Sequence, residues 1–580
     1  MTTYYSDEKN VQIILALLKE HGIKKVIASP GTKNMTLVVS MQNDPFFEMY
    51  SSVDERSAAY MACGLAAESG EPVVISCTGA TASRNYLSGL TEAHYRKLPV
   101  LAITSAQHPS KVGHNIAQII DRSMLPKDTA NFSVTLPIIK DDEDFWDCEI
   151  KVNKAILELK RYGGGPVHLN LPTTYSKSYN VKELPRVRVI HRITPFSNFP
   201  VLPKGKIAVF IGAHTVISQK QTEIIDKFCT TNNAVVFCDH SSNYKGKYRV
   251  LYALAAGQQM GDVTETMPDL FIHIGEVTGD YFSIKMAGKN VWRINEDGEI
   301  RDTFKKLSYV FEMPESKFFE YYSKDTQNNS TSYLDTCKSQ LKNLYNKIPE
   351  IPFSNIWIAS KMAHLIPENS TIHFGILNSL RSWNFFELPN SVTSSSNVGG
   401  FGIDGNVSSL IGASLANKNK LYFGIIGDLA FFYDLNVLGN RHVGNNLRIL
   451  LVNNGKGTEF RQFNHKAAQH GDTADDFIAA AGHFGNKSKT LVKHYAQDLG
   501  FEYLTASGKD EFEKGYKRFL NPQITETPIL FEVFTNSEDE SEALKSILNI
   551  EKATKGKAKQ FAKNILGNNG ISTLKKVVGK

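Results

Sequence analysis

Short apolar runs of strand length recur along the chain, and stretches with helical spacing separate them. In the first third these runs are KKVIASPG, PVVISCTG and LPVLAITS, while residues 10–20 and 57–69 have the apolar spacing of helices. Strands that are apolar on both faces are buried on both faces, and strands that alternate with helices form parallel sheets covered by helices. We therefore predict an α/β fold of doubly wound parallel sheets.

The same alternation recurs twice further along the chain. One segment begins with GKIAVFIGAHTVIS, and a later one contains STIHFGILNS, KLYFGIIGDLAFF, NLRILLVNNG and TPILFEVFTNS. A chain of 580 residues is long enough for several domains. We predict αβ domains at residues 1–185, 186–350 and 351–550, followed by a basic tail at 551–580. The polar helical stretch at 316–352 is interpreted as a connector.

The composition is that of a soluble globular protein, with 42% hydrophobic and 21% charged residues. No run reaches the roughly 18 apolar residues that a membrane-spanning helix needs. The N-terminal residues MTTYYSDEKN lack the basic-then-apolar order of a signal peptide. The six cysteines are scattered without a CxxC pair, which favours reduced thiols over a disulfide framework or a zinc site. We expect a cytoplasmic protein.

The positive charge is concentrated in the C-terminal tail. The chain carries a net charge of +6, and residues 551–580 hold eight lysines and one acid, which leaves the body close to neutral. The body therefore gives no reason to expect nucleic-acid binding. The tail is interpreted either as a solvated extension that docks on a neighbouring subunit, or as a weak contact to anionic lipid at the inner membrane surface. The second interpretation would suit synthesis of cell-surface polysaccharide or of a secondary metabolite.

Two polar motifs follow apolar strands in the last third of the chain. Gly427-Asp428-Leu429 follows LYFGII, and Asn453-Asn454 follows LRILLV. Asp428 and Asn454 are 26 positions apart, enough for one strand–helix–strand unit, so both are expected at the same edge of the sheet. Their oxygens, with the backbone carbonyl of Lys456 nearby, suit Mg²⁺. Either motif alone would more often be a helix start or a turn.

Together these motifs resemble the diphosphate-binding signature of thiamine-diphosphate enzymes, GDG followed later by NN. GDLAFFYDLNVL, and SNVGGFGIDG where the family has SNRG…GIDG, are similar to 2-succinyl-5-enolpyruvyl-6-hydroxy-3-cyclohexene-1-carboxylate synthase, the carboligase of menaquinone synthesis. The resemblance implies thiamine diphosphate and Mg²⁺ as cofactors, and Ile403 as an apolar wedge that holds the cofactor bent. The residues implied to contact the cofactor or metal here are Gly402, Ile403, Asp404, Gly427, Asp428, Leu429, Asn454 and Lys456.

A further resemblance assigns a catalytic acid in the first domain. SVDERSAAYMACGLAAESG is similar to the family's DERSAGFxALGLAxASG, whose glutamate contacts N1′ of the aminopyrimidine, and the corresponding residue is Glu55. A carboxyl group there favours the imino tautomer, whose 4′-nitrogen removes the thiazolium C2 proton before a 2-oxo acid is attacked. Thr78 and Gly79 match the small-residue loop beside the pyrimidine. Because the two half-sites lie in different domains, the family builds each site between subunits, which implies a homodimer or homotetramer.

The resemblance weakens where the family binds its anionic substrates with arginines. The positions concerned are Lys33 in SPGTKN, His108 in AQHP, Val398 in SNVG, and Arg381 and Trp383 in NSLRSWNFF, where Arg381 stands two residues early. Asn378 and Ser379 are kept, and Gln118 stands where the family has an active-site glutamine. We take Lys33, Gln118, Asn378, Ser379 and Arg381 as substrate residues. Fewer guanidinium groups predict an acceptor other than isochorismate, either a less anionic molecule or a proton.

The expected function is therefore decarboxylation of a small 2-oxo acid, dependent on thiamine diphosphate and Mg²⁺, with transfer of the resulting carbanion to an unidentified acceptor. One alternative is an acetolactate-synthase-like or pyruvate-decarboxylase-like enzyme, with or without a flavin in the middle domain. Another is a non-catalytic cofactor-binding paralogue. GDL and GIDG argue against the first alternative, and retention of Glu55, Asp428 and Asn454 argues against the second.

Overall fold

Parallel sheets with helices between successive strands form the frame of the protein. The computed structural model describes residues 4–122, 124–324, 330–484 and 487–551. Every ladder between its named strands is parallel, and the strands belong to three sheets. The predicted α/β class and the three sheet domains are thus confirmed. The basic tail predicted at 551–580 lies, apart from Glu551, outside the described residues.

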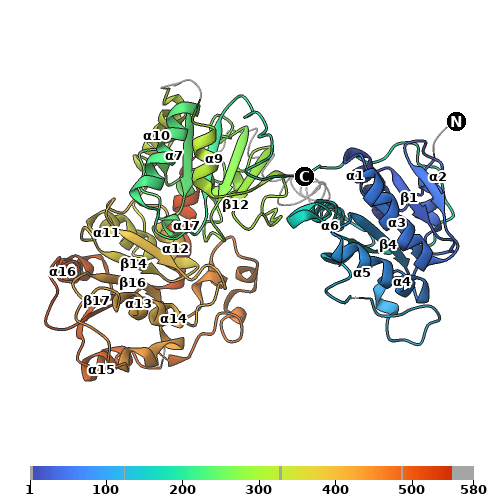
Figure 1. Ribbon diagram of the computed structural model, residues 1–580. Coiled ribbons are helices and arrows are strands. Elements are labelled where there is room, and N and C mark those ends of the chain that lie inside the picture. The colour runs from blue at the N-terminus through green and yellow to red at the C-terminus, as the bar shows by residue number, and fades with distance from the viewer. Residues whose placement is uncertain (1–3, 123, 325–329, 485–486, 552–580) are drawn as a thin grey trace, which may run out of the picture. The chain divides into compact units, whose positions relative to one another are not determined.

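The chain divides into two units, coloured mainly blue and green-to-red in Figure 1. The first unit contains residues 1–196 and 298–312, and the second contains residues 197–297 and the chain from 313 onward. The second unit holds the C-terminal sheet and five strands of the central sheet. The exact domain boundaries proposed from the sequence remain predictions.

The first unit is built on a six-stranded sheet in the order β2-β1-β3-β4-β6-β5. Its strands are β1 (Lys25–Ala28), β2 (Glu48–Ser51), β3 (Val73–Thr78), β4 (Val100–Ala106), β5 (Phe132–Thr135) and β6 (Val167–Pro172). Its helices are α1 (Lys9–Glu20), α2 (Met35–Gln42), α3 (Glu55–Ser69), α4 (Thr81–Asn85), α5 (Leu87–Tyr95) and α6 (Asp142–Glu158). The apolar runs and helical stretches predicted in this region all form the expected elements.

Successive residues of a strand in this sheet pack into two different hydrophobic clusters. Val74 and Leu101 pack in one hydrophobic cluster with residues of α1 and α6, whereas Val73 and Val100 pack in another with residues of α3 and α5. Figure 1 shows these helices around the sheet. Because side chains alternate across a strand, a run without polar residues is what a sheet covered on both faces requires.

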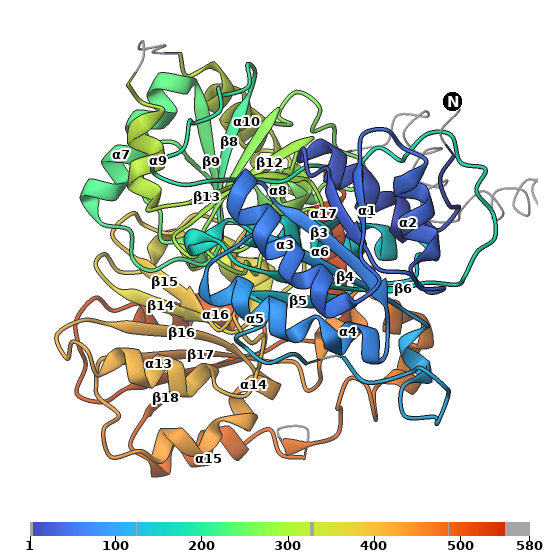
Figure 2. The same cartoon turned by 45° about the vertical axis from the view of Figure 1, so that its right-hand side comes forward.

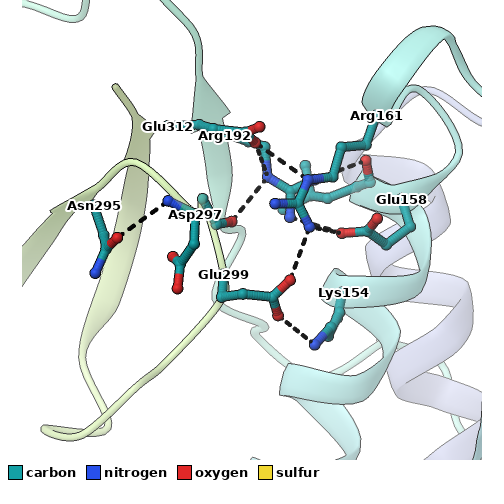
Figure 3. A network of polar contacts seen from close by, with 10 residues as sticks. Lys154, Glu158, Arg161, Arg192, Asn295, Asp297, Glu299 and Glu312 are labelled. Atoms are coloured by element: carbon teal, nitrogen blue, oxygen red, sulfur yellow. Dashed lines mark hydrogen bonds and ion pairs between the residues drawn. The ribbon is translucent and has the colours of Figure 1, made fainter. Parts of the chain in front are cut away.

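An ion-pair network attaches residues 298–312 to the first unit (Figure 3). Glu299 lies 2.8 Å from Nζ of Lys154 and 2.9 Å from Nη1 of Arg161. Glu312 lies 3.2 Å from Nε of Arg161 as an ion pair, and Arg192 pairs with Glu158, which also contacts Arg161. Near these residues β13 (Leu307–Glu312) pairs in parallel with β7 (His191–Ile193). No pattern in the sequence indicated that this later segment packs with the first domain.

The central sheet has seven strands in the order β10-β9-β8-β11-β12-β13-β7, of which the first five belong to the second unit. These five strands are β8 (Ile207–Ile211), β9 (Ala234–Cys238), β10 (Arg249–Val250), β11 (Leu270–Ile274) and β12 (Asn290–Asn295), and the helices of this domain include α7 (Gln219–Asn232), α8 (Ala253–Gly257), α9 (Glu315–Tyr321) and α10 (Ser332–Tyr345). The stretch interpreted as a connector is helical as expected, but it is part of this domain. Tyr333 of α10 is buried and donates to the carbonyl oxygen of Thr266 at 2.7 Å.

The C-terminal sheet has the order β15-β14-β16-β17-β19-β18. Its strands are β14 (Thr371–Phe374), β15 (Thr393–Ser396), β16 (Tyr422–Gly427), β17 (Leu447–Asn453), β18 (Glu502–Ala506) and β19 (Ile529–Phe534). Its helices are α11 (Asn355–Met362), α12 (Asn378–Trp383), α13 (Asn406–Ser414), α14 (Asp428–Tyr433), α15 (Leu491–Asp498), α16 (Lys509–Phe519) and α17 (Ser537–Leu548). Helices α13, α14 and α15 lie along one side of this sheet (Figures 1 and 2).

The structure also describes the cysteines and the lengths of the helices. All six cysteines are buried and free, so none takes part in a disulfide. Within the described residues, the helices are all too short or too polar to cross a membrane.

Candidate active site

The carboxyl ends of β16 and β17 bring Asp428 and Asn454 to one edge of the C-terminal sheet. The two strands are adjacent and parallel, with Gly427 opposite Val452. Asp428 is the first residue of α14, and it is only 5% exposed. Its carboxylate accepts the backbone N–H of Leu429 at 2.9 Å and that of Gly455 at 2.7 Å. It therefore ties the end of one strand to the loop after the next, which a simple helix cap would not do.

Burial raises the pKa of Asp428 to about 7, although the backbone N–H groups act in the opposite direction. A carboxylate in this position is stabilised when a cation replaces the water that it has lost. The arrangement thus favours a bound metal ion over an empty cavity.

Asn454 supplies a second oxygen donor at the candidate metal site. Its side-chain Oδ1 is buried and has no hydrogen-bond partner in the structure. A buried amide oxygen without a partner costs free energy unless a ligand satisfies it. Among the described residues, no cluster of three His, Cys, Asp or Glu side chains is arranged to hold a metal ion. The oxygens of Asp428 and Asn454 are a different donor set, and they fit a hard cation such as Mg²⁺.

Lys456 takes part in this loop through two groups. Its ammonium group pairs with Asp475 at 2.7 Å and is therefore committed away from the metal position. Its backbone carbonyl accepts the N–H of Thr458 at 2.8 Å, and a carbonyl oxygen has a second lone pair for a metal. Gly455 has φ of +79°, which allows the tight turn before Lys456.

A cavity of about 160 Å³ opens beside these groups in the second unit. Eight of the residues implicated by the sequence line it: Asn378, Ser379, Ile403, Gly427, Asp428, Leu429, Asn454 and Lys456. Gly402, Asp404 and Arg381 do not line it. Ile403 is half-buried and packs against the core beneath α13, whereas Asp404 is exposed.

Arg381 is held by Glu459 rather than free to bind a substrate. Its Nη1 lies 2.7 Å from Oε2 of Glu459, and its guanidinium stacks over the ring of Tyr281 at 4.8 Å. With its amide oriented to satisfy both contacts, Asn378 donates to the same carboxylate at 2.7 Å and accepts the N–H of Glu459 at 3.0 Å. Glu459 therefore compensates the positive charge that the sequence assigned to substrate binding.

Glu540 is a second buried carboxylate on the wall of the same cavity. It accepts the backbone N–H of Asn355 at 3.0 Å and the hydroxyl of Thr535 at 2.8 Å. Burial, with a smaller contribution from the negative charges of Asp539 and Asp428, raises the pKa of Glu540 to about 7.

The first unit presents the residues implicated in the other half-site. Glu55 is the first residue of α3 and is half-buried, and Asn85 of α4 donates to its Oε2 at 3.2 Å. The N-cap of α3 is Asp54, whose side chain accepts the N–H of Arg56 at 2.9 Å. Since the neighbouring residue performs the capping, Glu55 is not needed for that role.

In this unit, the predicted substrate residues Lys33 and Gln118 lie close to the end of β3, at Thr78 and Gly79. A Cβ built on Gly31 of the SPG turn would lie 2.9 Å from Cβ of Thr78. Lys33 is buried, and its ammonium donates to the backbone carbonyl of Gln118 at 3.0 Å. Gln118 itself has φ of +63°, an unusual value for a residue with a side chain.

Comparisons with known proteins decide the family. The sequence model described as "Thiamine pyrophosphate enzyme, N-terminal TPP binding domain" matches residues 9–125. The 2-succinyl-5-enolpyruvyl-6-hydroxy-3-cyclohexene-1-carboxylate (SEPHCHC) synthase of Bacteroides fragilis is 30% identical over 562 residues, covering 93% of this chain and 98% of the relative. The chain belongs to the SEPHCHC synthase family of thiamine-diphosphate enzymes. The synthase of Bacteroides thetaiotaomicron is also 30% identical, and that of Flavobacterium johnsoniae is 26% identical over 546 residues, covering 90% of this chain and 95% of the relative.

The structure gives the surroundings of three positions that were predicted to depart from the arginines of the SEPHCHC synthase family. Val398 is buried, and a Cβ on Gly279 would lie 3.3 Å from its Cγ1, so this position belongs to the apolar core. Trp383 is fully buried and donates through Nε1 to Asn355 at 3.1 Å. His108 is exposed and bonds to Ser110. None of these side chains can take over the role of a substrate-binding guanidinium.

The sequence did not point to three charged residues that lie at the two candidate half-sites of this chain. Glu459 stands in the same loop as Asn454, so its proximity could have been inferred from its position. Glu540 lies in the acidic run SEDESEA, which reads as a solvated helix start. Arg122 is only 6% exposed in a segment whose fold the sequence did not predict.

Proposed function

We propose that this protein decarboxylates a 2-oxo acid and transfers the resulting carbanion to an acceptor, with thiamine diphosphate and Mg²⁺ as cofactors. The observation that carries the proposal is the pairing of buried Asp428 with the unpartnered Oδ1 of Asn454 at adjacent strand ends. The family membership supports thiamine diphosphate, and the oxygen donors support Mg²⁺.

Each residue has a defined task in this proposal. Asp428, Asn454 and the carbonyl of Lys456 would hold Mg²⁺, which binds the diphosphate. Glu55 would hold a proton at the aminopyrimidine nitrogen. When bound, thiamine diphosphate supplies the electron sink that stabilises the carbanion left by CO₂. The apolar side chains of Ile403 and Leu429 would limit the access of water at the cofactor.

The acceptor is proposed to carry fewer negative charges than isochorismate. Three positions where the family has arginine hold Lys33, His108 and Val398, and Arg381 is neutralised by Glu459. A second candidate is SEPHCHC synthesis itself, because the named relatives align over nearly their full length. The acetolactate-synthase-like and pyruvate-decarboxylase-like alternatives are less well supported, since the aligned relatives bear a different name.

A screen for CO₂ release tests the proposed reaction. Purified protein with Mg²⁺ and thiamine diphosphate is incubated with pyruvate, 2-oxobutyrate, 2-oxoisovalerate, phenylpyruvate or 2-oxoglutarate, with and without isochorismate. We expect cofactor-dependent CO₂ release from at least one 2-oxo acid. Efficient formation of the SEPHCHC product would contradict the altered acceptor, and no CO₂ from any 2-oxo acid would contradict the reaction class.

A homodimer or homotetramer is also proposed, because the family completes each site with a second subunit. The surface around the helix that begins at Glu55 supports this assembly. Exposed apolar side chains gather on α3 and α5 and the turn before α3: Val53 (80% exposed), Tyr60, Met61 and Tyr95 (71% exposed). Such side chains near one another commonly mark a protein–protein interface.

A further inference from the structure

A cavity in the first unit is lined by apolar residues and by the guanidinium of Arg122. Its volume is about 220 Å³, and its apolar walls include Ala80, Ala106, Val112 and Ile119. Its polar lining includes Gln107, Gln118, Asp121, Thr135 and Asn170. All of these named lining residues belong to the first unit.

Arg122 is held by one terminal nitrogen, while the other is unpaired among the described residues. Nη2 donates to Oδ1 of Asn170, and the amide nitrogen of Asn170 donates to Thr135 at 3.2 Å, which determines how the amide is oriented. Nη1 is buried and has no hydrogen-bond partner in the structure. A Cβ on Gly79 would lie only 3.2 Å from Nη1, so this nitrogen lies against the cofactor-loop glycine.

The charges around Arg122 are mainly positive. Burial, followed by the charges of Arg122 and Lys111, lowers the pKa of the Lys33 ammonium. The neighbouring His168 is fully buried, which lowers its pKa to about 3, so it is neutral at pH 7. Among the described residues that line the cavity, the one carboxylate belongs to Asp121, which is exposed. A buried guanidinium with a free N–H and a second cation nearby is stabilised by a bound anion.

We propose that Arg122 binds one carboxylate group of an acceptor that has an apolar body. Arg122 stands outside the motifs that carried the family resemblance. Its guanidinium would supply part of the positive charge that the missing arginines provide for substrate carboxylates in the family. One guanidinium suits one carboxylate, which agrees with an acceptor less anionic than isochorismate. The identity of the ligand as an acceptor rests on the proposed function, whereas binding of a carboxylate does not.

The test compares two probes of the same shape and different charge. Benzoate and benzamide are titrated calorimetrically into the full-length protein, with and without thiamine diphosphate and Mg²⁺. We expect benzoate to bind at least tenfold more tightly than benzamide. Arg122→Met should weaken benzoate binding at least tenfold and leave benzamide unchanged, and Arg122→Lys should lie between them. Arg186→Met, which removes an exposed charge in the same unit, is the matched control and should bind benzoate normally.

Equal binding of benzoate by the unmodified protein and the Arg122→Met variant would overturn the proposal, as would equal binding of the two probes. Should the variant fail to fold, hydrogen exchange of the unmodified protein decides the question. Benzoate, and not benzamide, should then protect peptides spanning residues 112–122, and no protection by benzoate would overturn the proposal. These readouts need no turnover, so a failed CO₂ screen would leave their outcome intact.

Discussion

Individual side chains divide the proposed chemistry between two half-sites with different electrostatics. In the second unit, the buried carboxylates of Asp428 and Glu540 line a cavity. Glu459 lines the same cavity and pairs with the guanidinium of Arg381. In the first unit the buried cations Lys33 and Arg122 have little compensation. Carboxylates suit the metal end of a cofactor, and cations suit an anionic substrate.

Glu55→Gln tests the proton-holding residue. The change keeps the size of the side chain and its contact with Asn85 but removes the titratable proton. We expect CO₂ release to fall at least about 100-fold, in line with the loss of a general acid–base group, while thiamine diphosphate binds with similar affinity. Full activity in this variant would contradict the assigned role.

Glu540→Gln tests the consequence of burying a carboxyl group beside the metal site. The folded-state pKa of about 7 lies above the ordinary value of 4.5, so the protonated group favours folding. Its contribution is present below pH 4.5 and is lost as pH rises towards 7, amounting to at most about 3 kcal/mol. In metal-free protein, the decline in unfolding free energy between pH 4.5 and 7 should be shallower for the variant. Identical pH profiles from denaturant titrations would contradict this account.

The sequence located those site residues that follow directly from strand ends. Asp428 and Asn454 were predictable because each comes after an apolar run, and parallel strands place such positions at one edge. Glu540 could not be distinguished from the exposed Glu538 in the same acidic run, because its burial depends on α11 packing against it. Arg122 was equally hidden, since its partner Asn170 lies 48 positions away.

At the scale of elements, the interior strands were predictable and the edge strands were not. Strands β3, β4, β16 and β17 are buried along nearly their whole length and are mainly apolar. The edge strand β15 has the sequence TSSS, which lacks an apolar signature because one side of it has no neighbouring strand. Hydrophobic periodicity reports burial, so it cannot identify strands that bury little.

Gly212 tests the packing of the loop that follows β8 in the central domain. A Cβ at this position would overlap the carbonyl oxygen of Glu276, which is backbone and cannot move aside cheaply. We expect Gly212→Ala to lower the unfolding free energy by about 1–3 kcal/mol. The matched control is Gly412→Ala in α13, where no atom lies within 4 Å and helix propensity predicts a gain of about 0.5–1 kcal/mol. Equal effects in denaturant titrations would contradict the packing argument.

For the whole molecule, the sequence predicted three domains but not how distant segments combine. Residues 298–312 join the first unit through Glu299 and Glu312, which pair with basic residues far earlier in the chain. Such pairs have no local signature, because surface-type charges occur throughout the sequence. The helices interpreted as a connector belong to the central domain for a similar reason, since Tyr333 is buried by residues distant in sequence.

The proposed assembly can be tested through the exposed side chains of α3. Met61→Glu places a charge on a face that should be buried between subunits, so it should shift the protein towards monomers in mass photometry. Val216→Glu places the same charge on another exposed apolar residue, in the central domain, and serves as the control. A monomeric unmodified protein would contradict the proposed oligomer.

The central claim is that Asp428 and Asn454 hold the metal that binds thiamine diphosphate. It is tested most directly by calorimetric titration of thiamine diphosphate into metal-free protein, with and without Mg²⁺, using the unmodified chain and the Asn454→Ala variant. We predict saturable, Mg²⁺-dependent binding of one cofactor per chain that is weakened at least tenfold in the variant. Binding that is independent of Mg²⁺, or unaffected by loss of the Asn454 amide, would contradict the account.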